Sequence, residues 1–165
     1  MTGPTEGTDA FQDLTGRLDV PMVIVTAAAD GERSGCLVGF STQCSIDPPR
    51  YLVCISRANH TFAVAARSGY LAVHVLEPSD RELAVLFGEQ TGDRVDKFAA
   101  CSWQTRRGVP VLDGVRGWFV GRVLDRLPLG DHVGHVLEPV EGRSAPDLDG
   151  LTLLQVYDME PGHPA

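Results

Sequence analysis

The sequence lacks the short motifs that identify several large classes of enzyme. It has no Gly-x-Gly-x-x-Gly fingerprint and no Gly-Lys-Ser phosphate loop, so a nucleotide-binding doubly wound sheet is not indicated. It has no Gly-x-Ser-x-Gly elbow, and its cysteines have no evident histidine partner. These absences disfavour hydrolases that use a serine or cysteine nucleophile.

Long hydrophobic runs are absent as well. No run reaches the ~18 apolar residues of a membrane helix, and the first residues do not form a basic start followed by an apolar stretch. We therefore expect a cytoplasmic location. The 22 acidic and 14 basic side chains give a formal net charge of -8, which argues against nucleic acid or a membrane as partner. A small anionic ligand needs a local positive site on such a surface.

Lysine and metal-binding patterns are also scarce. Lys97 is the single lysine, and every other basic residue is arginine. The four cysteines show no Cys-x-x-Cys spacing and lie mostly in apolar runs, which favours reduced thiols. The closely spaced histidines, His132 and His135, are three apart on a predicted strand and point to opposite faces. We therefore expect no metal site.

What the sequence does contain is enough material for one domain. Its 165 residues are 43% hydrophobic and 22% charged, values close to those of soluble globular proteins. Residues 1–10 offer little to bury and are expected to form a mobile tail, as is the segment 158–165. The domain itself is expected over residues 11–157.

Alternation and turn residues predict a mainly antiparallel β-fold. The Asp30-Gly31 pair predicts a hairpin turn, and Gly69 and Gly88 are interpreted as helix stops. About seven strands with two short helices inserted early fit an antiparallel barrel with helices at its rim better than alternating strand-helix units. The strands are predicted at 21–29, 35–43, 51–56, 71–76, 118–127, 132–140 and 151–157, and the helices at 11–18, 59–68 and 80–88.

Two segments carry candidate chemistry. Small and hydroxyl residues fill positions 38–45, and Ser56-Arg57-Ala58-Asn59-His60-Thr61 stands at a helix start, where free amides and the helix dipole favour an anion. An ordinary capped helix explains the second segment equally well. Lys97-Phe98 has two interpretations too, because it can be a solvated cation beside a core aromatic residue.

Several segments together resemble the flavin reductase-like family, whose members fold as an FMN-binding split barrel. They are residues 35–49, SRANHT, GYLAVHVL with RELAVLFGEQTGDRVDKF, GVPVLDG and LGDHVGHVLEPV, in the family's order and spacing. The resemblance covers residues 21–157. It implies an antiparallel split barrel with short helices at the rim, and a homodimer with flavin in a groove near the subunit interface.

The resemblance also implies site residues. His132 matches a histidine near the flavin and the nicotinamide, although a structural histidine bound by Asp131 remains an alternative. The family usually begins its ring-contacting stretch with Thr and small residues, whereas this chain has Leu-Val-Gly-Phe, which leaves backbone contacts possible. The implied ring contacts are Leu37, Val38, Gly39, Phe40, Ser41 and Thr42, and the implied phosphate contacts are Ser56, Arg57, Asn59, His60 and Thr61, followed by Lys97 and Phe98.

The implied activity is that of a flavin reductase. Such an enzyme transfers hydride from NADH or NADPH to FMN or FAD and often supplies reduced flavin to a partner monooxygenase. This chemistry needs no general base, because the cofactor carries it. The alternatives are a deazaflavin-dependent oxidoreductase and a non-catalytic flavin- or haem-binding split barrel. The choice between FMN and FAD, and between NADH and NADPH, stays open.

Overall fold

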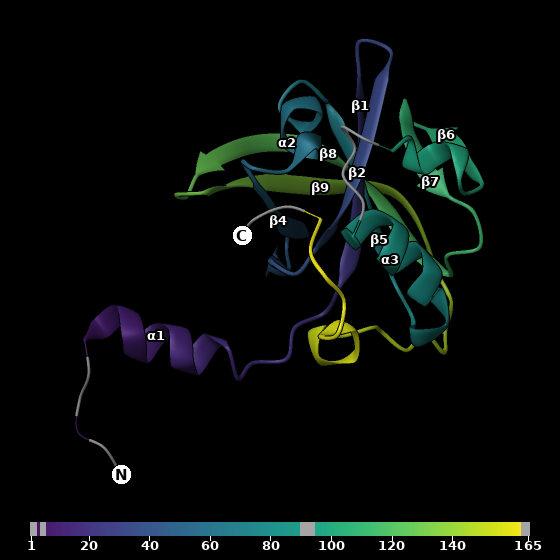
Figure 1. The fold of residues 1–165 in the computed structure, drawn as a ribbon. Helices are drawn as coiled ribbons and strands as arrows, with labels where there is room; N and C mark the ends of the chain where they lie inside the picture. Colours follow the sequence, from purple (N-terminus) through teal and green to yellow (C-terminus); the bar gives the residue numbers. More distant parts are fainter. Residues whose placement is uncertain (1–2, 4–5, 90–94, 163–165) are drawn as a thin grey trace.

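A computed structural model describes residues 3, 6–89 and 95–162, and its centre is an antiparallel seven-stranded sheet (Figure 1). The strand order is β2-β1-β5-β8-β9-β4-β3. The strands are β1 (Val23–Ala29), β2 (Glu32–Val38), β3 (Ser41–Ser45), β4 (Arg50–Ser56), β5 (Tyr70–Val75), β8 (Gly117–Pro128) and β9 (His132–Ser144). The helices are α1 (Gly7–Thr15), α2 (His60–Ala65) and α3 (Arg81–Glu89). There are also three 3-10 turns in the described residues, η1 (Pro78–Asp80), η2 (Lys97–Ala99) and η3 (Leu153–Val156).

The sheet closes on itself where β2 passes into β3. These strands are neighbours in sequence but lie at opposite ends of the strand order. The amide of Cys54 in β4 donates to the carbonyl of Phe40 at 2.9 Å, which continues the β3–β4 pairing up to the corner, and β2 also contacts β4, so the two ends of the sheet lie close together. The predicted antiparallel split barrel is therefore confirmed. The predicted single strand 35–43 is wrong, because Gly39 and Phe40 interrupt it.

The β1–β2 hairpin forms as predicted. Asp30 and Gly31 have φ values of 52° and 77°, the left-handed conformation that a two-residue hairpin turn requires. A second hairpin, β6 (Trp103–Arg106) with β7 (Val109–Leu112), was not predicted. Its turn uses Arg107 and Gly108 with φ values of 51° and 82°. Because arginine is an unusual residue in that conformation, the turn signal in the sequence is weak there.

Two apolar clusters hold the helices against the barrel. Val25, Val53, Leu71 and Leu137 are buried inside the barrel, where α2 adds its own apolar side chains. Outside the barrel wall, Phe87 of α3 packs in a second cluster with residues of β1, η2 and the C-terminal segment. This arrangement places α2 and α3 on either side of β2.

Two predicted helix stops are wrong. Helix α2 ends at Ala65, before Gly69. Gly88 lies within α3, and a Cβ atom placed on it would lie 2.9 Å from Cδ2 of Leu37. Gly88 therefore permits close packing of α3 on β2 and does not end the helix.

The predicted last strand, 151–157, is also wrong. Its central residues form η3, where the amide of Thr152 donates to Oε1 of Gln155 at 2.9 Å. This capping contact favours a helical turn, and Thr152 pairs with Pro21 through an isolated bridge. Much of the polar segment 89–96 lies outside the described residues, since 90–94 are not described.

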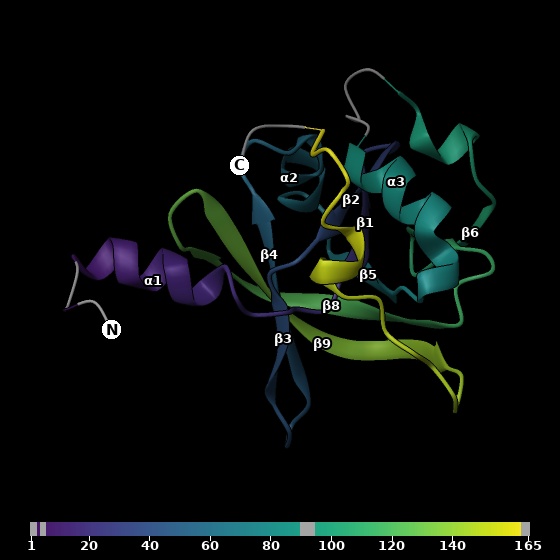
Figure 2. The ribbon, with the colours of Figure 1, turned by 60° about the horizontal axis from the view of Figure 1, so that its bottom comes forward.

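Helix α1 stands apart from the barrel (Figures 1 and 2), with no buried side chain in it. It begins and ends earlier than the predicted helix 11–18. The β3–β4 hairpin extends from the barrel in Figure 2. Of the helices in the described part of the chain, none is long and apolar enough to cross a membrane.

Candidate functional site

A cavity of about 150 Å³ lies where the barrel closes. It gathers residues from β2, β4, the turn before α2, and the start of β9. Its lining residues are Cys36, Leu37, Val38, Gly39, Phe40, Cys54, Ser56, Asn59 and His132. Six of the predicted cofactor contacts and the predicted histidine thus lie around one hollow, which we call the ring cavity.

The backbone of β2 forms an open wall of the ring cavity. Leu37 and Val38 pair on one side with Ile24 and Val23 of β1. Because β2 stands at the end of the strand order, alternate N–H and C=O groups point away from β1. These groups can hydrogen-bond a flat heteroaromatic ligand, which agrees with the predicted backbone contacts.

His132 is fixed at the rim of the ring cavity by two neighbours. Its Nδ1 lies 2.7 Å from Oδ1 of Asp131, and its ring centroid lies 4.9 Å from that of Phe40. The hydrogen bond with His132 lowers the pKa of the Asp131 carboxyl, so the carboxylate accepts and Nδ1 donates. The contact with Asp131 is the one expected for a structural histidine. It also orients the imidazole that lines the cavity.

The cysteines of the ring cavity do not supply a nucleophile. Burial raises the pKa of the Cys36 thiol to about 11, and burial also raises that of Cys54. A thiol with a raised pKa stays protonated and unreactive at neutral pH. All four cysteines of the chain are free thiols in the structure.

The turn before α2 is held by its own polar groups. Ser56 Oγ accepts from the amide of Ala58 at 3.2 Å, and Asn59 Oδ1 accepts from the amide of Thr61 at 2.9 Å. The Thr61 side chain is fully buried, with Oγ1 2.9 Å from Oγ of Ser34. These contacts match an ordinary capped helix of six residues. Phosphate binding by this turn therefore stays a prediction.

Arg57 of the same turn contacts the turn between β8 and β9. Its Nε donates to the carbonyl of Gly130 at 3.0 Å, and its guanidinium lies 5.6 Å from the Phe62 ring centroid. The backbone amide of Arg57 donates to the carbonyl of Asp131 at 2.8 Å. Arg57 thus holds the β9 turn in place beside His132.

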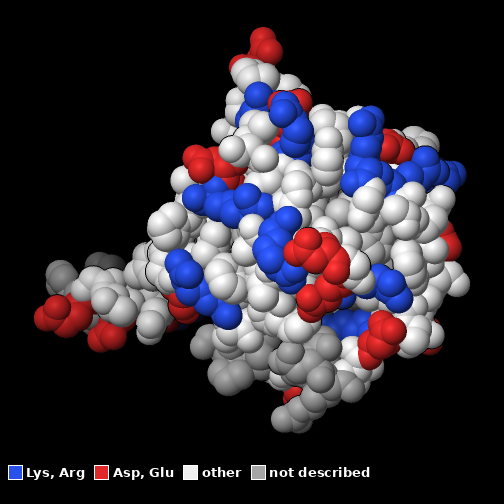
Figure 3. All heavy atoms as spheres, turned by 90° about the horizontal axis from the view of Figure 1, so that it is seen from above, with Lys and Arg blue, Asp and Glu red and all other residues white. Residues whose placement is uncertain are grey.

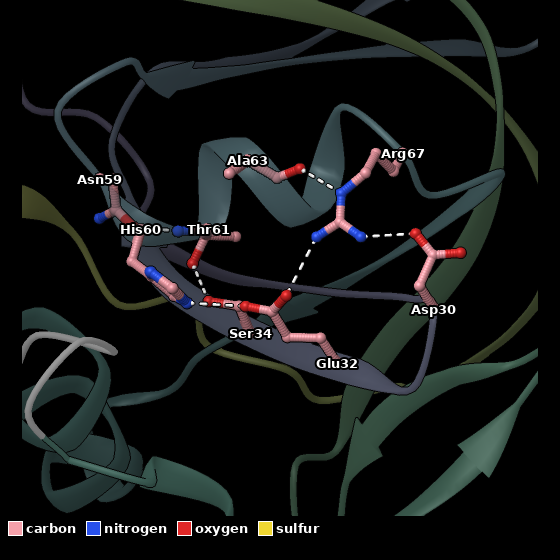
Figure 4. A network of polar contacts seen from close by, with 8 residues as sticks. All are labelled: Asp30, Glu32, Ser34, Asn59, His60, Thr61, Ala63 and Arg67. Carbon is pink, nitrogen blue, oxygen red and sulfur yellow. Dashed lines mark hydrogen bonds and ion pairs between the residues drawn. The ribbon is translucent and has the colours of Figure 1, made fainter.

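His60 belongs to a polar network beside the β1–β2 turn (Figure 4). Its Nε2 lies 3.1 Å from Oε1 of Glu32, and Arg67 donates to Oε2 of Glu32 at 3.0 Å. Arg67 also donates to Oδ2 of Asp30 at 2.5 Å. The network ties α2 to the hairpin, and sequence reasoning missed it because its partners are distant in the chain.

A second cavity, of about 410 Å³, continues along β2 toward the hairpin turn. Its lining runs from Gly31 to Gly35, whereas the ring cavity uses β2 from Cys36 onward. The other lining residues are His60, Val95, Asp96, Lys97 and Phe98. We call this hollow the hairpin groove.

Lys97 forms part of the floor of the hairpin groove. Its side chain is buried, and Nζ donates to the carbonyls of Gly35 at 3.0 Å and Phe87 at 3.1 Å. Burial lowers the pKa of Lys97. The interpretation of Lys97 as a solvated cation is wrong. Contact with a phosphate requires its remaining N–H and stays a prediction.

The structure separates the predicted site residues into three groups. Leu37, Val38, Gly39, Phe40, Ser56, Asn59 and His132 surround the ring cavity, and His60, Lys97 and Phe98 line the hairpin groove. Ser41, Thr42, Arg57 and Thr61 line neither cavity. Ser41 instead bonds Oη of Tyr51 at 2.8 Å. Sequence reasoning missed Arg33, although its place after a hairpin turn and two residues before Gly35 puts it on the same face of β2.

The chain is similar to known proteins over most of its length. The model of the flavin reductase like domain matches residues 15–158. A probable flavin reductase of Rhizobium meliloti is 30% identical over 135 residues, which are 81% of this chain and 42% of that protein. FMN reductase (NADH) RutF of Methylorubrum extorquens is 34% identical over 125 residues, which are 74% of this chain and 61% of the relative.

A solved structure shows the same fold. The NADH:FAD oxidoreductase of Streptomyces globisporus superposes with a TM-score of 0.81 at 21% identity, and 92% of each chain is covered. The chain spans about half the length of the curated relatives it matches. The family model, by contrast, spans most of the chain, and the protein belongs to the flavin reductase like domain family.

Proposed function

We propose that the protein is a flavin reductase that uses NADH or NADPH to reduce FMN or FAD. The observation that carries this proposal is the ring cavity, where the open edge of β2 meets an oriented histidine. A flat ligand on that wall finds backbone hydrogen-bonding groups on one side and Phe40 and His132 at the rim. When bound, flavin supplies the hydride acceptor, and the chain positions the two reactants.

The residues of the ring cavity fit a role in positioning. Asn59 offers a side-chain amide at one end of the cavity, and Gly39 allows close approach of a flat ring to the backbone. His132 has a fixed orientation because Asp131 accepts from its Nδ1. No residue here needs to act as a general base, because hydride transfer moves no proton onto the protein.

A homodimer is part of the proposal. The ring cavity, at about 150 Å³, is smaller than the roughly 300 Å³ or more of typical small-molecule sites, so one chain covers only part of a flavin ring. Phe40 beside it is 61% exposed, and Ile46 of the β3–β4 hairpin is 84% exposed. A second copy that covers these side chains would complete the cavity.

Light scattering at micromolar concentration tests the dimer. The expected mass is twice 17.8 kDa. Replacement of Ile46 by Glu should place a charge in the interface and yield monomers with weaker flavin binding. A monomeric parent protein with full flavin affinity would contradict this part of the proposal.

The proposal also gives the protein a place in the cell. Reduced flavin that leaves the site can react with oxygen on a second enzyme. We therefore propose that the protein supplies a separate monooxygenase, and that both are in the cytoplasm. Curated relatives are named FMN reductase (NADH) and probable flavin reductase, which supports the reductase activity.

Oxidation of NADH and NADPH, followed by near-ultraviolet absorbance with FMN and with FAD, tests the activity. Turnover with at least one pair is expected. Flavin binding without turnover by any pair would favour the non-catalytic alternative, and a Soret band on the isolated protein would favour haem. Turnover with a deazaflavin alone would favour the deazaflavin-dependent alternative.

A further inference from the structure

The hairpin groove is larger than the ring cavity and lies along the same strand. The two hollows have volumes of about 410 and 150 Å³. From Gly39 to Arg33 the chain advances six residues, which is about 20 Å in strand geometry. A ligand that spans both hollows is longer than a riboflavin phosphate and has the extended form of a dinucleotide.

Arg33 is an exposed cation in the lining of this groove. Its guanidinium carbon lies 4.6 Å from the ring centroid of Trp103 and 5.8 Å from that of Phe98. A guanidinium over the face of an indole is held there by cation–π attraction, and its N–H groups can still donate to a ligand. Within the described part of the chain, no carboxylate or carbonyl oxygen lies within hydrogen-bond distance of that guanidinium. Arg33 is exposed and lies over the indole of Trp103, so its donors are available to a ligand.

The acidic residues of the groove are already engaged. Glu32 accepts from Arg67 and contacts His60, and Asp96 accepts from the amide of Phe98 at 3.1 Å. The Lys97 ammonium lies beneath the groove and adds positive charge. Figure 3 shows several groups of Lys and Arg atoms, with Asp and Glu among them, on the face that carries the β1–β2 turn. An anion can bind here despite the net charge of -8.

We propose that the hairpin groove binds the adenosine-phosphate half of a dinucleotide and that Arg33 recognises it. The guanidinium forms paired hydrogen bonds with a phosphate, and its stacked plane suits an adenine ring as well. The same chemistry is present in FAD and in NADH or NADPH. The inference rests on the proposed function, because the other half of the ligand occupies the ring cavity.

Calorimetry with ADP alone is the direct test. The parent protein should bind ADP, and Arg33→Ala should weaken that binding at least tenfold, which is about 1.4 kcal/mol. Arg33→Lys retains the charge but loses the planar guanidinium, so its affinity for ADP should lie between those of the parent protein and Arg33→Ala. Arg143→Ala is the matched control, since Arg143 is exposed and contacts neither cavity. Equal ADP binding by the parent and Arg33→Ala would overturn the proposal.

Paired ligands then identify the source of the adenosine phosphate. If FAD supplies it, Arg33→Ala weakens FAD binding, followed by flavin fluorescence, and leaves FMN binding unchanged. If the nicotinamide dinucleotide supplies it, the KM for NADH rises while that for reduced nicotinamide mononucleotide stays constant. If Arg33→Ala changes neither the ratio of FAD to FMN affinity nor the ratio of the two KM values, and the protein still reduces flavin, the inference is overturned. ADP binding through Arg33 in a protein without turnover would instead overturn the proposed function alone.

Discussion

At the scale of single residues, His132 links the geometry of the site to its proposed chemistry. Asp131 and Phe40 hold its imidazole from two directions. Replacement of His132 by Ala should lower kcat/KM for NADH about tenfold, a loss of ~1.4 kcal/mol of transition-state stabilisation, with flavin affinity retained. Steady-state kinetics with varied NADH at saturating flavin measure this effect.

The matched control for His132 is Asp131→Asn. It keeps the imidazole and removes the carboxylate that orients it, so its effect should be smaller. Unaltered kinetics in His132→Ala would reduce His132 to a structural residue of the β9 turn.

Asn59 has two separable roles, in the proposed ligand site and in the cap of α2. Replacement by Ala should remove both, so that flavin binding weakens and the free energy of unfolding falls by about 1 kcal/mol. Asn59→Ser keeps a capping oxygen and should restore stability but not flavin affinity. Urea unfolding and flavin titration of both variants separate the roles. Unchanged flavin affinity in both would place the phosphate elsewhere.

At the scale of elements, the packing of α3 on β2 depends on the absence of a side chain at Gly88. A Cβ atom there would lie 2.9 Å from Leu37 Cδ2 and 3.1 Å from Cε of Met159. Gly88→Ala should therefore lower the free energy of unfolding by about 1–3 kcal/mol, measured by urea denaturation. It should also displace Leu37 and weaken flavin binding.

The control for Gly88 is Gly69→Ala. No atom lies within 4 Å of the Cβ position at Gly69, so this variant should be neutral or slightly more stable. Equal stability of Gly88→Ala and the parent would show that α3 can shift without cost.

Several elements could be predicted because their signals are local. The Asp30-Gly31 pair predicts its turn, and the β-branched and aromatic residues of β4 predict its strand. The interruption at Gly39 could not be predicted, because the two strands that it separates pair with different partners, β2 with β1 and β3 with β4, and this choice of partners is not a local signal. The sequence predicted most residues of the ring cavity, but it did not point to Arg33 of the hairpin groove, whose significance depends on the distant Trp103.

At the scale of the whole molecule, His74 joins three strands in the interior. It is fully buried, with Nδ1 3.0 Å from the carbonyl of Ile24 and Nε2 accepting from the amide of Leu112 at 3.0 Å. The accepting Nε2 requires that Nδ1 donate, so the imidazole is neutral. Burial lowers the pKa of His74 from 6.5 to about 4.

This shift predicts loss of stability in mild acid. The folded pKa lies below the unfolded value, so the unfolded chain binds the proton first. The contribution is complete above pH 6.5 and decreases as the pH falls toward 4, by up to about 3 kcal/mol. Urea unfolding at pH 7 and pH 5 measures it. His74→Gln should be less stable at both values but with a smaller difference between them, and an equal difference would contradict the prediction.

The closure of the barrel at Phe40 and Cys54 gives the ring cavity a thermodynamic property as well as a shape. A ligand held between β2, β4 and His132 bridges β2, at one end of the strand order, and β4, which is next to the strand at the other end. Ligands that bind only the folded state raise its stability by mass action. Occupancy of the cavity and closure of the barrel are thus linked equilibria, and exchange of the Cys54 amide with solvent deuterium would report both.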